Sequence, residues 1–214
     1  MFIDRGLLNK LYRDYVRHGR SLRNPALWVL FVYRYGVWSQ QLPNPARWLT
    51  SKIYGGWAIF VQVLTGTEIY RETAIGDDLH LIHGTNIKIH ADAVIGDRCG
   101  MMHDVTLGTN DGRERKRTGA PRIGHDVFIG AGAKVLGPIT VGDGATIASN
   151  SLVTIDVPPG TTAIGVPARI LRFPTKPLAQ PTASPSNSDP PATGDLRASK
   201  EGADSLCEPT PPMS

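Results

Sequence analysis

The sequence predicts a mainly β fold, in which a solenoid of short parallel strands follows a helical segment and precedes a disordered tail. Between residues 69 and 153 an apolar residue recurs along the chain, and ten of its twelve spacings are six residues. That period matches neither a helix, with 3.6 residues per turn, nor a strand, with a period of two. In a hexapeptide solenoid each repeat supplies one strand and one corner, and the apolar residue fills the axis. The recurring positions are Ile69, Ile75, Leu81, Ile89, Ile95, Met101, Leu107, Ile123, Ile129, Val135, Val141, Ile147 and Val153.

Two irregularities interrupt this repeat. A slip of two residues falls between Leu81 and Ile89, and ten extra residues fall between Leu107 and Ile123. The second insertion is polar and strongly charged, so it cannot remain within the coil. We therefore expect an extruded loop over residues 108–121, a kind of loop that often carries function on a rigid scaffold.

Residues 1–66 are predicted to be helical. Apolar side chains at positions 7, 8, 11, 12 and 15 share one helical face, Asn24-Pro25 is typical of a helix start, and Pro43 and Pro45 end that helix. All four tryptophans lie in this segment. We expect them to pack a helical cap onto the open end of the solenoid, which would otherwise expose strand edges. The alternative is a peripheral membrane contact through residues 24–66, because tryptophan and arginine together suit a headgroup layer.

The last residues, 173–214, differ in composition from the rest. They hold nine of the 17 prolines and few large apolar side chains, so folding would not bury enough surface to offset the ordering entropy. The predicted organisation is a helical segment at 1–66, a hexapeptide-repeat domain at 67–172 and a disordered tail at 173–214.

Charge and composition exclude several classes of protein. The formal net charge is +4, concentrated before residue 66, but no nucleic-acid-binding module is visible, so we expect no nucleic-acid partner. The N-terminus lacks the apolar core of a signal peptide, and Arg34 interrupts the longest apolar run. Two cysteines do not make a disulfide framework. A cytoplasmic protein is therefore expected.

Histidines supply the strongest chemical signal. His83 and His103 each follow a repeat position by two residues and are one turn of a three-sided coil apart, so we expect them to stack beside the extruded loop. Histidine suits base chemistry near neutral pH, and Glu68, at the start of the same coil, is a candidate orienting acid. No serine or cysteine lies in a nucleophile elbow. Zinc held by His83, His90 and His103 is the alternative, but His90 falls out of the column, so no metal is expected.

The run from Gly66 to Leu171 resembles the catalytic region of serine O-acetyltransferases in the hexapeptide acyltransferase superfamily. The matching pieces are LTGTEI (64–69), LIHGT (81–85), HDVTLG (103–108), IGAGAKVLGPITVGDGATI (129–147) and VPPGTTAIGVPARIL (157–171). The resemblance covers about half of the chain, and the last piece is a specific signature.

The resemblance implies a left-handed parallel β-helix that forms a homotrimer or a dimer of trimers, with acetyl-CoA as co-substrate. It places the general base on His83 and the orienting carboxylate on Glu68, where the family has Asp. The residues it implies for CoA binding are Gly108, Thr109, Ala131, Gly132, Lys134, Ala163, Pro167 and Arg169. Lys134 and Arg169 would meet the phosphates.

The chain departs from the family pattern where the acceptor binds. Ile82 replaces the Asp before the base, and Gly119-Ala120 replaces an Arg-His pair that holds the amino-acid acceptor. Candidate acceptor residues are therefore Ile82, His103, Arg117 and Arg122. The same departures occur in relatives that acetylate sugars of exopolysaccharide precursors, so a sugar acceptor is expected ahead of L-serine.

The predicted reaction is direct acetyl transfer to an acceptor hydroxyl with His83 as the base. Two alternatives belong to other classes: a metal-dependent hydrolytic enzyme of the carbonic-anhydrase type, and a non-catalytic scaffold. The intact GVPAR sequence at 165–169 argues against both.

Overall fold

The computed structural model of the chain describes residues 5–110 and 118–172. Three helices come first: α1 (Arg5–Arg17), α2 (Pro25–Gln40) and α3 (Ala46–Thr65). The side chain of Asn24 accepts a hydrogen bond from the Ala26 N–H at 3.0 Å, and Pro25 occupies the first turn, where no N–H is needed. Gly66 ends α3 in the left-handed conformation, with φ +68°.

Fifteen short strands follow in the described residues, and they form three sheets. Sheet A holds β1 (Glu68–Ile69), β4 (Lys88–Ile89), β7 (Thr106–Gly108), β10 (Lys134–Leu136) and β13 (Leu152–Val153). Sheet B holds β2 (Ala74–Ile75), β5 (Val94–Ile95), β8 (Arg122–Ile123) and β11 (Thr140–Val141). Sheet C holds β3 (His80–Leu81), β6 (Gly100–Met101), β9 (Phe128–Ile129), β12 (Thr146–Ile147), β14 (Thr162–Ile164) and β15 (Arg169–Leu171).

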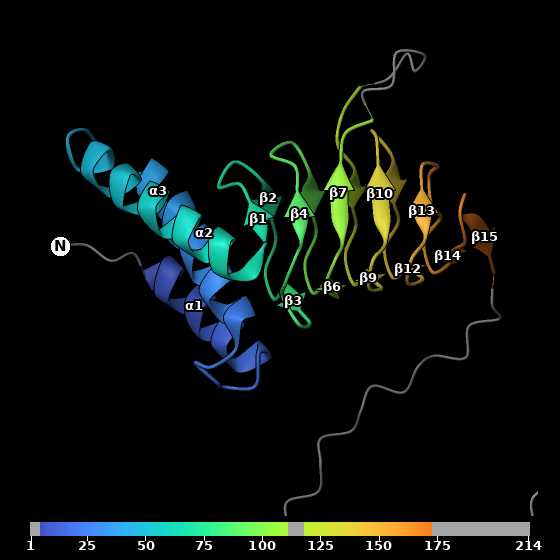
Figure 1. Cartoon of the computed structure of the whole chain (residues 1–214), viewed down its shortest axis with the longest axis horizontal. Helices are drawn as coiled ribbons and strands as arrows, with labels where there is room; N and C mark the ends of the chain where they lie inside the picture. Colours follow the sequence, from blue (N-terminus) through green and yellow to red (C-terminus); the bar gives the residue numbers. More distant parts are fainter. Residues whose placement is uncertain (1–4, 111–117, 173–214) are drawn as a thin grey trace, which may run out of the picture. The chain divides into compact units, whose positions relative to one another are not determined.

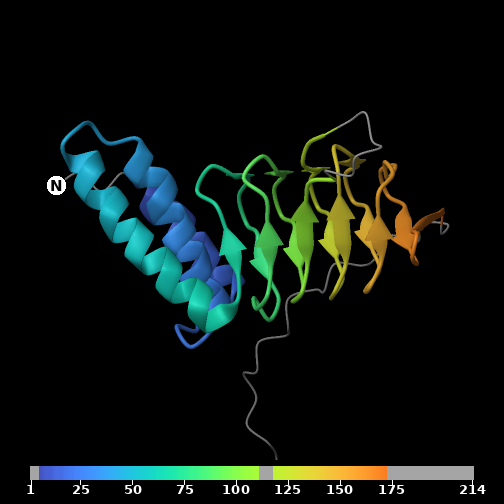
Figure 2. The ribbon, with the colours of Figure 1, turned by 45° about the horizontal axis from the view of Figure 1, so that its top comes forward.

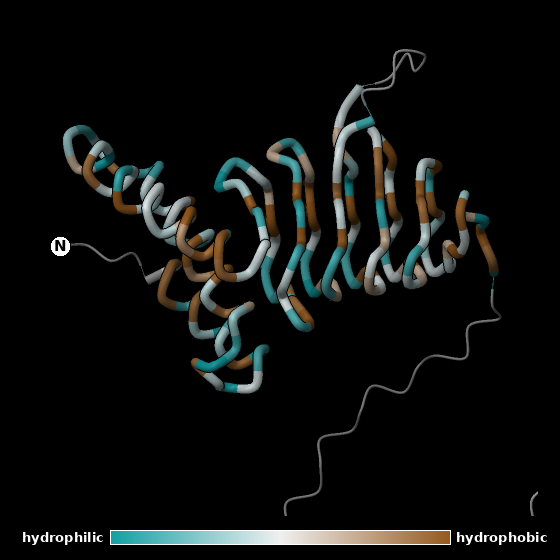
Figure 3. The backbone as a smooth tube through the Cα atoms, in the orientation of Figure 1, coloured by the Kyte–Doolittle hydropathy of each residue, from teal (hydrophilic) through white to brown (hydrophobic). Residues whose placement is uncertain are grey.

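The chain visits sheets A, B and C in turn, so each turn of the coil is three-sided (Figure 1). Parallel pairing places Ile69 opposite Ile89 and Leu81 opposite Met101, which stacks the repeat residues in columns. Nearly all of them are fully buried, and Figure 3 shows hydrophobic positions recurring from coil to coil. The predicted parallel β-helix is confirmed, and the two-residue slip is absorbed at the corner after β3. The exception to parallel pairing is β15, which runs antiparallel to β14.

The helices lie at the end of the β-helix that begins with β1 (Figures 1 and 2). Polar side chains make the connection. The Tyr33 hydroxyl donates to the Thr73 carbonyl at 2.7 Å, and the Arg34 guanidinium donates to the carbonyls of Ile75 and Gly76 at 3.3 and 2.8 Å. These bonds occupy carbonyls of the first coil that an open solenoid end would leave unpaired.

Just after α1, His18 completes this connection. Its Nε2 accepts the Leu81 N–H at 3.1 Å, and its Nδ1 lies 2.7 Å from the Asp14 carbonyl. Because Nε2 accepts, the proton of the neutral ring resides on Nδ1. A buried histidine thus closes the edge of sheet C.

The expectation that the tryptophans pack this cap is wrong. Trp28, Trp48 and Trp57 are 41, 65 and 47% exposed. Their place on the first coil is taken by Tyr33, Arg34 and His18, which bond to backbone groups that an indole ring could not satisfy so well. Indole offers one donor and no acceptor.

We expect Tyr33→Phe to lower the free energy of unfolding by about 1–2 kcal/mol, because the buried Thr73 carbonyl loses its hydrogen-bond donor. Tyr12→Phe is the matched control, since Tyr12 is 64% exposed. Urea unfolding followed by circular dichroism measures both. Equal stability of the two variants would show that the Tyr33 bond contributes nothing to holding the helices on the coil.

Parts of the sequence-based prediction fall outside the described residues. These are the tail at 173–214 and the centre of the expected loop, including Arg117. The division of residues 1–172 at position 66 stays a prediction, because the helices and the β-helix belong to one compact unit. Within the described ranges, no helix is long and apolar enough to cross a membrane.

Candidate functional site

One corner of the β-helix, between sheets C and A, carries the histidine pair. The rings of His83 and His103 are 6.1 Å apart between centroids and meet edge to face. His83 is exposed, whereas His103 is half-buried and its Nδ1 is buried without a hydrogen-bond partner. The predicted stacking of the two imidazoles is confirmed. An exposed ring supported by a half-buried one suits contact with a substrate.

The backbone fixes His83 at this corner. Its φ of +56° lies in the left-handed region, which a tight turn requires there. The Thr67 hydroxyl donates to the Gly84 carbonyl at 3.1 Å, and the Asn86 N–H donates to the Thr65 carbonyl at 2.9 Å. The corner is therefore tied to the chain that leads from α3 into β1.

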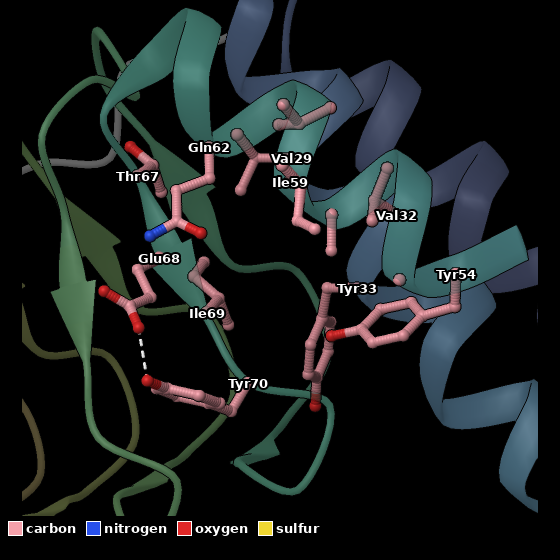
Figure 4. A pocket seen from close by; sticks show the side chains of 13 residues that line it. Val29, Val32, Tyr33, Tyr54, Ile59, Gln62, Thr67, Glu68, Ile69 and Tyr70 are labelled. Atoms are coloured by element: carbon pink, nitrogen blue, oxygen red, sulfur yellow. Dashed lines mark hydrogen bonds between the residues drawn. The ribbon is translucent and has the colours of Figure 1, made fainter. Parts of the chain in front are cut away.

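Glu68 is the first residue of β1, and its side chain makes no hydrogen bond to His83. Its carboxylate accepts a short hydrogen bond from the Tyr70 hydroxyl, drawn in Figure 4, and lies 3.5 Å from Nζ of Lys88. The bond to Glu68 raises the pKa of Tyr70, since it stabilises the protonated phenol. The expected direct orientation of His83 by Glu68 is thus not present in this structure.

Beyond Glu68 lies a cavity of about 270 Å³ between α2, α3 and β1. Figure 4 shows Glu68 and Tyr70 on one side and Tyr33 and Tyr54 on the other, with aliphatic side chains above them. Burial raises the pKa of Tyr33 and Tyr54, so both are neutral phenols at physiological pH. Its lining includes Glu68 but neither His83 nor His103.

The described ends of the extruded loop do not lie beside the histidines within one chain, and its centre at 111–117 lies outside the described residues. The loop leaves β7 and re-enters at β8, at the corner between sheets A and B. A Cβ on Gly119 would lie 3.1 Å from Pro138, and one on Gly137 would lie 3.2 Å from Asn110, so the loop ends pack at that corner. The whole width of sheet A separates them from His83.

Two of the predicted acceptor residues can be placed relative to the histidine pair. Ile82 is half-buried next to the base, and its N–H donates to the Met101 carbonyl at 2.7 Å. Arg122 is exposed on β8 in sheet B, on another side of the coil. It therefore does not join His83 and His103 within the chain.

Several of the predicted CoA residues share the histidine corner, lower in the stack. Ala131 and Gly132 follow β9 there, and the Gly132 N–H donates to the His103 carbonyl at 3.0 Å. Lys134 begins β10; its Nζ donates to the Asp104 carbonyl at 2.7 Å and lies 3.1 Å from the Thr106 hydroxyl. Two of its three protons are thus held, which leaves one for a ligand.

The other predicted CoA residues are more dispersed. Gly108 ends β7 on sheet A and Thr109 follows it, both half-buried. Pro167 and Arg169 are exposed beside β15. Ala163 is fully buried in sheet C, and its contribution to CoA binding stays a prediction.

The geometry gives less support to a zinc site that includes His90 or to a cysteine nucleophile. His90 follows β4 at the corner between sheets A and B and lies 3.8 Å from an Asp92 carboxylate oxygen, so it does not join His83 and His103. Burial raises the pKa of the Cys99 thiol to about 11, which keeps it protonated and unreactive at neutral pH.

Sequence reasoning missed Tyr70 and the Asp14–Arg34 pair. Tyr70 is two residues beyond Glu68, and the two-residue period of a strand places both on one face. That spacing could have identified it. Arg34 was noted only as an interruption of an apolar run, although a lone charge in such a run signals a buried partner.

Comparison with known proteins points in one direction. The family described as "Bacterial transferase hexapeptide (six repeats)" matches residues 120–154. The chain is 37% identical over 152 residues to the serine acetyltransferase of Mycobacterium tuberculosis, which covers 68% of this chain and 64% of that protein. It spans 64, 57 and 53% of the lengths of the first three curated relatives that it matches.

Solved structures of serine acetyltransferases have a similar fold. The soybean enzyme complexed with serine aligns with a TM-score of 0.65 and 28% identity, over 78% of this chain and 70% of that one. The Brucella abortus enzyme in complex with coenzyme A aligns with a TM-score of 0.63 and 28% identity, over 77% and 66% of the two chains. Both alignments extend well beyond the residues matched by the repeat family.

Proposed function

Because the chain is a serine-acetyltransferase-like member of the hexapeptide-repeat transferases, we propose that it transfers the acetyl group of acetyl-CoA to a hydroxyl group. The observation that carries this proposal is the exposed His83 stacked on His103 at one corner, directly above Gly132 and Lys134 of the same column. A base and a candidate thioester site thus lie along one edge of the coil.

His83 is the general base in this proposal. Its imidazole removes the proton of the acceptor hydroxyl while that oxygen attacks the thioester carbonyl carbon. The tetrahedral intermediate then collapses, the C–S bond breaks, and the CoA thiolate takes the proton from the imidazolium. Each proton and electron pair returns to a stable product, and no covalent intermediate on the protein is needed.

The proposed role of Glu68 is electrostatic. Glu68 begins the coil that leads to His83, and in this proposal its negative charge favours the imidazolium that forms during transfer. A direct Glu68–His83 hydrogen bond would require the carboxylate to leave the Tyr70 hydroxyl. The oxyanion needs a donor as well. Gly108 ends β7 across sheet A from His83, so the proposed source is the backbone N–H groups near Gly108 of a neighbouring subunit.

The proposed CoA site follows the column of Ala131, Gly132 and Lys134 towards Pro167 and Arg169. Arg169 is an exposed cation, and Lys134 retains one free proton for a phosphate. The Brucella abortus relative was solved with coenzyme A, which supports this co-substrate. No metal is proposed for the reaction, and a cytoplasmic location stays a sequence-based prediction.

A homotrimer is proposed as the active assembly. The described ends of the loop lie at the corner of sheets A and B, across sheet A from His83. In a trimer of β-helices, one protomer's loop corner can meet the next protomer's histidine corner. The loop cations Arg113, Arg115, Lys116, Arg117 and nearby Arg122 would then come from a neighbouring subunit.

L-serine is the proposed acceptor, since the matched relatives are named serine acetyltransferases and one was solved with serine. A neutral sugar hydroxyl is the second candidate. Ile82 and Gly119-Ala120 supply no charge where the resembling serine enzymes have Asp and Arg-His, and a zwitterion needs charged partners in a desolvated site. The missing charges favour a sugar acceptor, as the sequence predicted. The names of the matched relatives favour serine instead.

We expect kcat/KM for L-serine to exceed that for sugars and nucleotide sugars in one preparation, and replacing Arg122 with Gln to reduce it about tenfold or more. The loss of a charge-assisted hydrogen bond costs about 1.5–3 kcal/mol. Thr140→Ala, on the neighbouring strand β11, is the control. Efficient transfer to a sugar with no transfer to serine would instead support the second candidate.

A further inference from the structure

The outer side of the helical pair is strongly apolar. Six exposed side chains of the loop before α2, of α2 and of α3 form what we call the apolar face: Leu22, Trp28, Phe31, Trp57, Phe60 and Leu64. Figure 3 shows hydrophobic positions recurring along the helical pair. Phe60 and Leu64 are 58 and 67% exposed, which is unusual for large apolar residues in contact with water.

These side chains form a continuous surface. Trp28 of α2 lines an apolar hollow of about 300 Å³ together with Trp57, Phe60 and Leu64 of α3. The Trp28 indole donates to the Leu22 carbonyl at 2.9 Å, and its ring meets Phe31 edge to face at 6.3 Å. The loop and both helices therefore contribute to one face.

The second half of α3 is as apolar as a helix that is buried on all sides. From Ile53 to Thr65 it has no charged residue, yet Val61 is its sole fully buried side chain. Lys52 lies on the side of α3 opposite the buried Val61, and Arg47 lies near the start of the helix. Arg47 and Lys52 are the only charged residues of α3.

Charge indicates what covers this face. Across residues 5–66 there are nine Lys or Arg and one acidic residue, Asp14, which is buried with Arg34. Lys10 and Arg13 pair with acidic groups of the β-helix. Arg17 interacts electrostatically with Asp126 of the β-helix. The remaining cations whose side chains are described are exposed and form no salt bridge among the described residues: Arg20, Arg23, Arg47 and Lys52.

We propose that the apolar face, flanked by these cations, docks the protein on an anionic lipid surface. Tryptophan and phenylalanine insert into the boundary between headgroups and acyl chains, while Arg and Lys meet the lipid phosphates. A second copy of the chain would bring the same positive charges together, so charge complementarity favours the lipid. The helices lie on the surface and do not span it.

The test is sedimentation of the full-length protein with vesicles of equimolar phosphatidylcholine and phosphatidylglycerol, beside vesicles of phosphatidylcholine alone. We expect binding to the anionic vesicles, weaker binding in high salt, and little binding to the neutral ones. Phe60→Asp/Leu64→Asp and, separately, Arg47→Gln/Lys52→Gln should each weaken binding more than about tenfold.

Ile155→Asp is the matched control, because Ile155 is 47% exposed on the β-helix, far along the chain from α3. It should leave vesicle binding unchanged, and circular dichroism should show that every variant is folded. Wild-type protein that stays in the supernatant with anionic vesicles overturns the proposal. So does light scattering in which Phe60→Asp/Leu64→Asp dissociates an oligomer without affecting vesicle binding, since the face would then join copies of the chain.

Discussion

Replacing His83 with Ala should lower kcat for acetyl transfer by about a hundredfold or more, because general-base assistance contributes roughly 10²–10⁴ in rate. The side chain is exposed at a corner of the coil, so its loss leaves the core intact. The thermal midpoint of unfolding should change little. Release of free CoA thiol measures the rate, and circular dichroism checks the fold.

His125→Ala is the matched control for that experiment. His125 occupies the same slot after a repeat residue, but at the corner after β8, where it contacts Asp97. It should keep nearly full activity. A folded His83→Ala protein with wild-type kcat would exclude His83 as the base.

Replacing Arg34 with Met should lower the free energy of unfolding by about 3–5 kcal/mol, since breaking a buried ion pair leaves an uncompensated charge. Arg34 and Asp14 are 4 and 1% exposed, and Arg34 also donates to the carbonyls of Ile75 and Gly76. Urea unfolding of the two proteins gives the difference.

The pH dependence of this variant follows from Asp14. Burial raises the pKa of Asp14 in the folded protein, and Arg34 opposes that rise. Without Arg34 the folded pKa of Asp14 is higher still, so the cost of its unpaired charge is fully present above that pKa and disappears below the unfolded pKa, where Asp14 is protonated in both states. The loss of the Arg34 hydrogen bonds to the Ile75 and Gly76 carbonyls remains at every pH. Arg34→Met/Asp14→Leu should regain much of the stability. A single variant as stable as wild type at pH 7 would contradict this account.

The β-helix was predictable because its signal is local. Each six-residue repeat carries its own interior residue, so the spacing from Ile69 to Val153 specifies strands, corners and register together. The stacking of His83 on His103 followed from the same register. These features depend on neighbouring coils alone.

The helical segment was predicted less well because its contacts are distant in sequence. Hydrophobicity suggested that the tryptophans face the coil, but the coil end presents carbonyls and N–H groups, which Tyr33, Arg34 and His18 satisfy. The partner of Glu68 was likewise misjudged, since the tyrosine two residues along the strand lies within easier reach than a corner histidine.

The position of the loop shows a further limit of sequence reasoning. The six-residue spacing does not indicate which corner of the coil contacts a neighbouring subunit. The loop and the histidines were therefore expected to lie side by side in one chain. In the structure sheet A separates the described ends of the loop from the histidines. Whether the loop serves the site depends on assembly, which a single chain does not encode in its own contacts.

The central claim, acetyl transfer from acetyl-CoA to a hydroxyl, is tested most directly by acceptor-dependent release of CoA thiol. The full-length protein is incubated with acetyl-CoA, with and without L-serine, and the O-acetylated product is identified by mass spectrometry. The account predicts thiol release that requires the acceptor and matches the product in amount. Absence of both thiol and acetylated product with serine and with sugars, in folded protein, would contradict it.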